Sequence, residues 1–443
     1  MQKKQKIPMD LVNKYIRTNY RVVGKYKHTS IKPCHWMEQK LLTGRENRNC
    51  YKGYWGIDSE TCIQNSPAYP FCNHSCVFCW RDTKTNYSTN FIVKPDDPEY
   101  LINELIRQQL SFVEHSFTKE RSLQNLDCMN DILKFFVKYA KTENVNQKKW
   151  KYGAEFTSKE IYKQIKQRFS KTQVLRAILL LKNTNILKTR DLEHYYLKDI
   201  VLRDIISREE GVSQILDKYV TNEKDINATF KNALKPKHAA ISLDGEPTLY
   251  PNICKFVDLF RNKRFTTFIV SNGTTPEVLL EMNETGTLPS ILYITLPPPK
   301  KTEYTKVCRP RVKHTWDKIQ ETLKILKELN TRTVLRITSV NHINIEHEMI
   351  AGYAKIIEET QPDFVDVKGF TLEGSSMQIS DRLSNQHKGS YYVPTFQELL
   401  DFSNQLCLNR EFEVIETHEK SRDILIRVNW PKDRGIKIQE NEI

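Results

Sequence analysis

The chain has 443 residues, of which 39% are hydrophobic and 28% are charged, and this balance is typical of a folded globular protein. It contains no run of about 18 apolar residues, and its first residues, MQKKQKIPMD, lack the apolar core of a secretory signal. We therefore expect a cytoplasmic protein without a membrane span. The net charge of +14 favours a polyanionic partner, and nucleic acid is the first candidate.

Residues 11–66 are short polar stretches with interspersed aromatic residues and no helical period, so they predict strands and loops. They hold Cys34, Cys50 and Cys62, whose spacings of 16 and 12 residues are too wide for a compact zinc finger. These residues alone leave two interpretations open: three buried thiols, or three ligands of one metal centre. Lys52 is also ambiguous, because a lysine is usually a solvated charge but forms a Schiff base with a ketone when its pKa is lowered.

The next segment, YPFCNHSCVFCWRD at 69–82, contains three cysteines in a C-x3-C-x2-C array, namely Cys72, Cys76 and Cys79. Three thiolates at this spacing hold a four-iron cluster in which one iron has no protein ligand. Zinc is the alternative, but it usually recruits a fourth close Cys or His. His74 lies between two of the cysteines, where joint coordination is awkward. Phe78 is either a ring that covers the cluster or an ordinary core residue. In a long chain without a signal peptide, such cysteine crowding favours metal over disulfides.

Residues 111–232 have a different character, because the part from 127 to 190 carries 15 Lys and Arg against 5 Asp and Glu. The pattern predicts a helix at 131–141, a short helix that opens at Thr157 or Ser158, a turn at 169–170, a helix at 172–181 and a wing at 184–199. This order resembles a winged helix-turn-helix, whose second helix faces nucleic acid. A generic basic helical insert is the alternative, and tRNA is the expected target if the insert binds nucleic acid.

From residue 236 onward, five short apolar runs alternate with helical segments such as 315–329 and 346–359. The runs are HAAISL (238–243), TTFIVSN (266–272), ILYITLP (291–297), TVLRITSV (333–340) and FVDVKGF (364–370). This alternation predicts βαβ units and an α/β fold with a parallel sheet, and a strand leading into the cysteine loop brings the number of strands to about six. A helix at 395–408 and a hairpin then follow and are expected to cap one edge.

Polar residues follow two of these predicted strands, at the sheet edge where chemistry gathers in such folds. Gly245 and Glu246 come after the first run, and Ser271 and Asn272 close the second. Gly245 permits close backbone approach, and Glu246 places a carboxylate at the mouth of the sheet. Each residue is also compatible with ordinary turn chemistry.

Six motifs together resemble the tRNA 4-demethylwyosine synthases of the radical S-adenosylmethionine (SAM) superfamily. They are KPCHW (32–36), CYKGYWGI (50–57), CNHSCVFCWR (72–81), KPKHAAISLDGEPTLYP (235–251), VSNGT (270–274) and KVCRPR (306–311). The resemblance covers most of the chain apart from roughly 111–232. It implies a partial (β/α)6 radical SAM barrel with an inserted, mainly helical basic domain. The single-domain archaeal-type branch is the nearest in organisation, and a separate flavodoxin or ferredoxin is expected as electron donor.

The resemblance also implies an activity and a set of site residues. The expected reaction is that of a carbon–carbon lyase that condenses N1-methylguanosine-37, in the anticodon loop of phenylalanine tRNA, with pyruvate to form 4-demethylwyosine. SAM would bind near Phe78, Gly245, Glu246, Ser271 and Asn272, and Lys52 would hold pyruvate. Two [4Fe–4S] clusters are implied, one on Cys72, Cys76 and Cys79 and one on Cys34, Cys50 and Cys62.

The expected domains are an N-terminal lobe (1–66), the barrel (67–110 and 233–393), the insert (111–232) and a C-terminal extension (394–443), in a monomer. One departure is TLPPP at 295–299, where related sequences usually read SLDAP, so an acidic residue is missing. The TLPPP departure and the insert leave open a radical SAM enzyme with another RNA substrate. The possible winged helix leaves open a non-enzymatic metal-dependent nucleic-acid-binding regulator.

Overall fold

The computed structural model describes residues 6–45, 48–81, 83, 87–142, 155–189, 191, 193–198, 200, 201, 212–439 and 442. The chain divides into two compact units. The barrel unit comprises Met1–Cys34, Cys50–Gln109 and Pro236–Ile443, and the insert unit comprises His35–Asn49 and Leu110–Lys235. None of the described helices is both long and apolar enough to cross a membrane.

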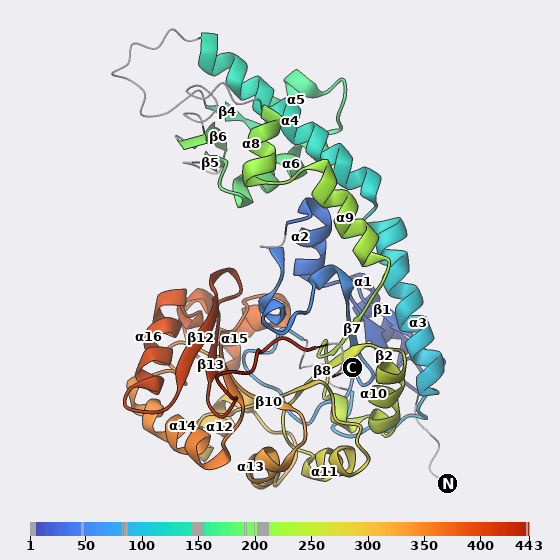
Figure 1. Cartoon of the computed structure of the whole chain (residues 1–443), viewed down its shortest axis with the longest axis vertical. Coiled ribbons are helices and arrows are strands. Elements are labelled where there is room, and N and C mark those ends of the chain that lie inside the picture. Colours follow the sequence, from blue (N-terminus) through green and yellow to red (C-terminus); the bar gives the residue numbers. More distant parts are fainter. Residues whose placement is uncertain are drawn as a thin grey trace. The chain divides into compact units, whose positions relative to one another are not determined.

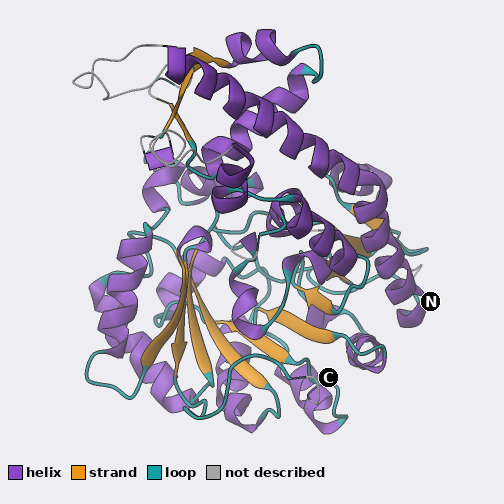
Figure 2. Cartoon of the chain, turned by 45° about the horizontal axis from the view of Figure 1, so that its top comes forward, coloured by secondary structure: helices purple, strands orange, loops and turns teal. Residues whose placement is uncertain are grey.

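The barrel unit is built on a ten-stranded sheet whose six middle strands are parallel (Figure 2). These six are β3 (Cys62–Ser66), β7 (His238–Ile241), β8 (Thr266–Ser271), β9 (Ile291–Thr295), β10 (Arg332–Ser339) and β11 (Phe364–Gly369). All five apolar runs form strands, and β3 is the additional strand that leads into the cysteine loop. The predicted radical SAM type of barrel is therefore confirmed in its parallel strands.

Antiparallel strands extend the sheet at both edges. β1 (Arg21–Val23) and β2 (Thr29–Ile31) lie beside β3, while β13 (Asp423–Arg427) and β12 (Glu413–His418) lie beside β11. The last two form the expected C-terminal hairpin. Because the two edge strands, β1 and β12, do not pair with each other, the barrel is open.

Helices connect successive parallel strands (Figure 1). The main ones are α10 (Ile253–Asn262), α11 (Pro276–Glu284), α12 (Lys301–Cys308), α13 (Thr315–Ile325) and α14 (His347–Thr360), and α16 (Phe396–Cys407) follows the last parallel strand, β11. Neighbours α11 and α13, α13 and α14, and α14 and α16 pack side by side. Helix α16 begins at Thr395, which forms a capping box with Glu398.

The interior of the sheet is filled by alternate residues of the strands and by a short 3-10 helix, η2 (Tyr51–Trp55). Trp55 is almost fully buried among strand residues such as Phe268 and Phe364, and its indole nitrogen donates to the hydroxyl of Tyr293 at 3.0 Å. Since η2 is anchored by this ring, its other residues, including Lys52, are held inside the unit.

The N-terminal region is more helical than its sequence indicates. Strands β1, β2 and β3 agree with the expectation for residues 11–66, but helices α1 (Met9–Arg17) and α2 (His35–Thr43) occupy stretches that were expected to be strands and loops, so the prediction was wrong there. Each helix is only nine residues long and buries few apolar side chains, such as Leu11 and Tyr15 in α1 and Met37 and Leu41 in α2. So short an i, i+4 pattern is easily hidden by interspersed polar and aromatic residues.

The insert unit contains a three-helix core and a small antiparallel sheet in the order β4-β6-β5. Its elements in chain order are α4 (Lys119–Thr142), β4 (Phe156–Thr157), α5 (Ser158–Ile165), α6 (Lys171–Asn183), β5 (Leu187–Thr189) and β6 (His194–Leu197). Capping boxes at Thr157 and Ser170 start α5 and α6. This order of helices and strands is that of a winged helix-turn-helix. Helices α8 (Val212–Tyr219) and α9 (Glu223–Ala233) follow.

Candidate active site

The loop that carries Cys72, Cys76 and Cys79 follows β3 and is fixed by a second segment of chain. Residues 307–311 run alongside it, and the backbone N–H of Val77 donates to the carbonyl of Val307 at 2.9 Å. The N–H of Arg311 donates to the carbonyl of Asn73 at the same distance, 2.9 Å. The KVCRPR motif therefore supports the cysteine loop, a role that sequence reasoning did not assign to it.

Arg382 holds the same loop from another side. Its Nη1 donates to the carbonyl oxygens of Cys76, Val77 and Cys79 at 3.1, 3.0 and 2.9 Å. One guanidinium thus fixes the backbone around two of the three cysteines. No sequence motif pointed to Arg382, because it lies more than 300 residues from its partners.

Arg81 supplies positive charge to the three thiols. Its side chain is buried, and its Nε and Nη1 have no hydrogen-bond partner among the described residues. Burial raises the pKa of Cys72 to about 11 and also raises that of Cys79, while the charge of Arg81 opposes both shifts. A buried guanidinium with unused donors beside three thiols fits an anionic metal–sulfur group bound there.

A single metal ion is a poorer fit. The described residues contain no group of three or more His, Cys, Asp or Glu side chains placed to hold one ion. His74 is engaged elsewhere, because its Nε2 hydrogen-bonds the hydroxyl of Tyr304 at 2.8 Å. Burial lowers the pKa of His74 to about 4, so the ring is neutral at physiological pH. Phe78 lies in the loop between Cys76 and Cys79 and is half-buried.

The two polar turns after β7 and β8 meet at the cysteine loop. Glu246 accepts hydrogen bonds from the hydroxyl of Ser271 at 2.9 Å and from the backbone N–H of Asn272 at 2.7 Å. The amide of Asn272 donates to the Oδ1 of Asn73 at 2.7 Å and lies 4.0 Å from the sulfur of Cys72. The structure therefore brings Glu246, Ser271 and Asn272 together next to the loop.

Gly245 makes this approach possible. Its φ is +72°, and a Cβ at this position would lie 2.1 Å from the carbonyl oxygen of Ala68. The next residue, Glu246, donates its N–H to the carbonyl of Phe71 at 2.8 Å. Only glycine combines this backbone conformation with such close contact.

The second group of predicted residues lies around Lys52. Its amine is buried and donates to the sulfur of Cys62 at 3.6 Å. Burial lowers the pKa of Lys52, but the negative charges of Cys62, Cys50, Tyr51 and Cys34 raise it above its ordinary value. The charges of all three cysteines therefore act on the Lys52 amine, and Cys62 is in direct contact with it. The lowered pKa that sequence reasoning assumed is not what these thiols produce.

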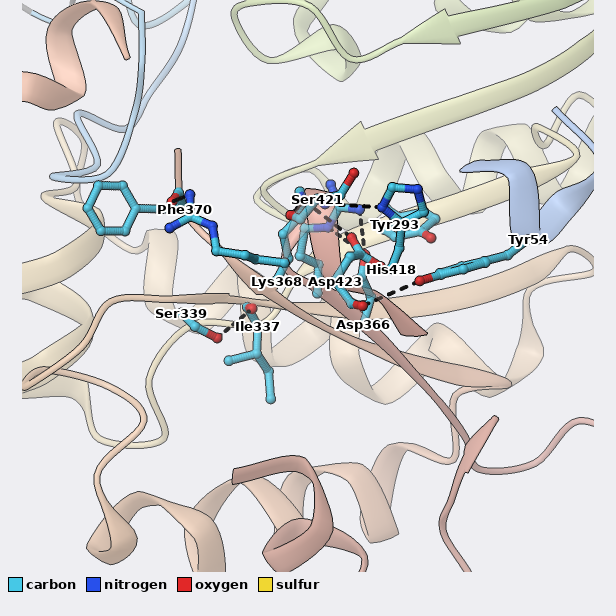
Figure 3. Close-up of polar contacts among 12 residues, drawn as sticks. Tyr54, Tyr293, Ile337, Ser339, Asp366, Lys368, Phe370, His418, Ser421 and Asp423 are labelled. Carbon is cyan, nitrogen blue, oxygen red and sulfur yellow. Dashed lines mark hydrogen bonds and ion pairs between the residues drawn. The ribbon is translucent and has the colours of Figure 1, made fainter. Parts of the chain in front are cut away.

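A buried charged network lies beside this group and was not anticipated (Figure 3). Arg336 of β10 forms an ion pair with Asp366 of β11, and Lys368 lies 3.3 Å from the carboxylate of Asp423 on β13. The guanidinium carbon of Arg336 and the amine of Lys368 each lie 4.8 Å from the ring centre of Tyr51. The network is thereby joined to the residue that precedes Lys52.

Burial raises the pKa of Asp423 to about 8; Asp366 adds to this shift, whereas Lys368 and Arg336 oppose it. Apart from the Lys368 amine at 3.3 Å, neither carboxylate oxygen of Asp423 has a hydrogen-bond partner within the described residues. The barrel interior therefore contains a carboxyl group whose pKa is raised by burial although two cations lie near it.

Comparisons with known proteins agree with this geometry. The sequence model described as the radical SAM superfamily matches residues 210–354, and the one described as wyosine base formation matches residues 359–428. The S-adenosyl-L-methionine-dependent tRNA 4-demethylwyosine synthase of Pyrococcus abyssi is 28% identical over 422 residues, which cover 95% of this chain and 89% of that protein.

This chain contains a radical SAM domain and a wyosine-forming domain, and it is similar over nearly its whole length to tRNA 4-demethylwyosine synthases. The synthase of Methanocaldococcus jannaschii is 26% identical, with 95% of this chain and 96% of that protein covered. A solved structure of archaeal TYW1 is 22% identical with a TM-score of 0.54, and one of TYW1 with a lysine–pyruvate adduct bound is 23% identical with a TM-score of 0.59. Each alignment covers 98% of this chain and 100% of the other. These two structures support the fold.

The radical SAM match implies SAM and a [4Fe–4S] cluster as cofactors. The cysteine loop at residues 72–79 lies outside both matched ranges, so its assignment depends on the geometry described above. The TLPPP segment follows β9, where the N–H of Leu296 donates to the carbonyl of Arg336 at 2.8 Å. The departure from the usual pattern is therefore next to the charged network.

Proposed function

We propose that this wyosine-pathway tRNA-modifying enzyme condenses N1-methylguanosine-37 of phenylalanine tRNA with pyruvate and releases 4-demethylwyosine in the tRNA. The relatives from Pyrococcus abyssi and Methanocaldococcus jannaschii carry the name of this activity. The observation that carries the proposal is the placement of the Lys52 amine, which is buried in the barrel unit against Cys62. A buried amine among metal-binding thiols is suited to hold a small ketone close to a metal centre.

The first centre is assigned to Cys72, Cys76 and Cys79. These three thiols would hold a [4Fe–4S] cluster with one open iron, and bound SAM would there supply a 5′-deoxyadenosyl radical that takes hydrogen from the substrate N-methyl group. Arg81 balances the negative charge, and Arg382 fixes the loop backbone. Phe78 would cover the bound cofactor.

Three further residues orient the cofactor at this centre. Glu246 already accepts bonds from Ser271 and Asn272, so the three act as one rigid unit beside Cys72. Gly245 lets this unit approach the cysteine loop. Preorganised polar groups of this kind position a reactive molecule without reorganisation during the reaction.

Lys52 is assigned to pyruvate. Its amine would attack C2 of pyruvate, lose water and form an imine. The substrate methyl carbon would then bond to C2 of the bound pyruvate. The C1–C2 bond would break and C1 would leave as CO2 with one electron, which balances the electron used to cleave SAM. The exocyclic amine of guanine would replace Lys52 at C2 and close the five-membered ring, with C3 left as its methyl group. This bond cleavage is the basis for classing the enzyme as a carbon–carbon lyase. A solved TYW1 structure contains a lysine–pyruvate adduct, which is a precedent in a protein of the same fold.

Cys34, Cys50 and Cys62 are assigned to a second [4Fe–4S] cluster. All three interact electrostatically with the Lys52 amine, and three ligands would again leave one iron open. Binding of iron would neutralise part of the negative charge of the three thiolates. This charge otherwise raises the pKa of the Lys52 amine and keeps it protonated. The arrangement thus couples metal loading to the reactivity of Lys52.

The remaining partners follow from this chemistry. The target base would be splayed out of the anticodon loop, because an enzyme cannot reach a stacked base. A separate flavodoxin or ferredoxin would donate the electron that cleaves SAM. We place the enzyme in the cytoplasm as a monomer.

The proposal is tested with anaerobically reconstituted protein, SAM, a reductant, pyruvate and phenylalanine tRNA that carries N1-methylguanosine. Mass spectrometry of the digested tRNA is expected to show the tricyclic nucleoside. Formation of 5′-deoxyadenosine without this nucleoside would favour another RNA substrate, which the TLPPP departure keeps as the second candidate. The non-enzymatic regulator is not supported, because both family matches are to enzyme domains.

A further inference from the structure

The winged helix of the insert unit carries an unusual excess of positive charge. Residues 157–189, all described, contain eight Lys and Arg and one acidic residue, Glu160. Glu160 is already used, because its carboxylate accepts from the backbone N–H and hydroxyl of Thr157 at 2.7 and 2.8 Å. The segment therefore offers no carboxylate to neutralise its own lysines.

The other described parts of the chain neutralise only one of these cations. Arg168 pairs with Asp131 of α4. The remaining seven form no ion pair or hydrogen bond with a described residue through their charged groups; they are Lys159, Lys163, Lys166, Lys171, Arg176, Lys182 and Lys188. Six of these are exposed or partly exposed lysines. We call these seven residues the basic group.

Several members of the basic group are close to one another. Lys159, Lys163 and Lys166 follow each other at i, i+4 and i+7, so they share one face of α5, whose helical conformation continues through Lys166. Arg176 of α6 also lies near Arg121 of α4, and both burial and this charge lower its pKa. Like charges at these spacings repel each other, and the repulsion is relieved when an anion binds between them.

The exposed surface of α6 indicates whether this region recognises the phosphates or the bases of a nucleic acid. Two leucines occupy its middle, Leu175 with 44% and Leu179 with 54% of their surface exposed. Lys171 and Lys182 lie toward its two ends. Leucines make no hydrogen bonds to base edges, and the deep, narrow major groove of A-form RNA does not admit a helix. The basic group is thus suited to phosphates rather than to base sequence.

We propose that the winged helix binds the phosphate backbone of folded RNA through the basic group, without sequence specificity. The natural ligand is then a helical stem of the tRNA substrate, and this part of the inference rests on the proposed function. Contacts to a stem would add affinity at a distance from the modified base. They would leave the choice of base to the barrel unit.

The test uses the full-length protein and fluorescently labelled phenylalanine tRNA. The dissociation constant is measured over a series of salt concentrations for the wild type and for the variant K159Q/K163Q/K166Q. We expect the variant to bind about tenfold to hundredfold more weakly, with a salt slope smaller by about 2 to 3, because three phosphate contacts are lost. Equal affinities and slopes for the two proteins would overturn the proposal.

Three further variants make the result specific. K171Q/K182Q on α6 tests the same basic group independently and is expected to weaken binding in the same way. K224Q/K231Q/K235Q removes three exposed lysines of the insert unit outside the winged helix and is expected to bind like the wild type. L175S/L179S is also expected to retain RNA affinity. If this leucine variant loses RNA affinity while the lysine variants retain it, the surface fits an apolar partner and the proposal is wrong.

The outcome is separable from that of the proposed function. SAM cleavage without tRNA is expected to be unchanged in all four variants, which shows that the barrel unit is intact. If salt-dependent, lysine-dependent RNA binding is found but no tricyclic nucleoside forms, the proposed reaction fails and the RNA-binding surface stands. If the nucleoside forms at equal rates and affinities in all variants, the proposed reaction stands and the RNA-binding surface is excluded.

Discussion

The amine of Lys52 points at the sulfur of Cys62 from 3.6 Å, and both side chains are buried inside the sheet of the barrel unit. This contact joins η2 to the first residue of β3, so a candidate catalytic amine and a candidate metal ligand are held by two rigid elements. The same η2 segment places Tyr51 against Arg336 and Lys368. The chemistry proposed for Lys52 thus depends on the whole interior and not on one flexible side chain.

Iron content provides the first prediction. Replacing Cys34, Cys50 or Cys62 by alanine is expected to remove about four irons per chain, because a three-cysteine site does not hold its cluster with two ligands. Replacing Cys72 is expected to remove a similar amount and to abolish SAM cleavage as well. Iron and sulfide are quantified after anaerobic reconstitution. The partly buried Cys407 is the control, and C407A should retain all iron; a C34A protein with full iron would disprove the second centre.

Gly245 is predicted to be irreplaceable for a steric reason. In G245A the new Cβ would lie 2.1 Å from the carbonyl of Ala68, and φ is +72°. We expect a loss of about 3 kcal/mol in the free energy of unfolding, together with weaker SAM binding. Gly286 is a matched control, since its φ is +66° and nothing lies within 4 Å of its Cβ position. G286A should cost only about 1 kcal/mol; equal costs in urea unfolding would refute this account.

Arg382 is predicted to retain the cluster rather than to react. R382Q removes the donors to the carbonyls of Cys76, Val77 and Cys79. Hydrogen bonds from a charged group contribute about 1.5–3 kcal/mol each at most, so the loop should loosen and iron should be released to a chelator at least tenfold faster. R410Q is the control, because Arg410 also donates to two carbonyls, those of Leu406 and Leu408, far from the cysteines in sequence. Unchanged iron release in R382Q would contradict the assigned role.

The stability of the protein is predicted to depend on pH through Asp423. Its pKa of about 8 in the folded state lies above the ordinary value of 3.8, mainly because of burial. The folded protein therefore binds one more proton than the unfolded chain between these values, and its stability falls as pH rises through that window. The slope is at most about 1.4 kcal/mol per pH unit.

The variant D423N has no such titration, so its stability should vary less with pH between 5.5 and 7.5. Urea unfolding of both proteins at several pH values measures the difference, which includes the response of the neighbouring Asp366, Lys368 and Arg336. Parallel curves for the two proteins would show that Asp423 has an ordinary pKa. The result matters for function, because it reports whether the carboxyl beside Lys368 carries a proton.

The sequence was most informative where the signal is local. Short, mainly apolar runs predicted β7 to β11, because strands of a parallel sheet are buried on both faces. Gly245, Glu246, Ser271 and Asn272 were identified because they follow two of these strands. The capping residue Thr157 was one of the two candidates for the start of α5, and the structure selects it.

The buried ion pairs could not be predicted, because they depend on how neighbouring strands align and the sequence does not reveal this alignment. Arg336 faces Asp366 because β10 and β11 pair in that register, and Lys368 faces Asp423 because β11 and β13 do. The charges within the runs of β10 and β11 were the available signal, since such charges are rarely buried unpaired. The contacts of Arg382 and of residues 307–311 with the cysteine loop have no local pattern at all, because they join segments more than 200 residues apart.

The most direct test is to trap pyruvate on the enzyme with borohydride. Reconstituted protein is incubated with isotopically labelled pyruvate, reduced, digested and mapped by mass spectrometry. Lys52 is expected to carry the label, with an added mass of pyruvic acid less one oxygen, and K52R is expected to carry none while still cleaving SAM. Label on another lysine, or an unlabelled Lys52 in protein that forms the tricyclic nucleoside, would contradict the account.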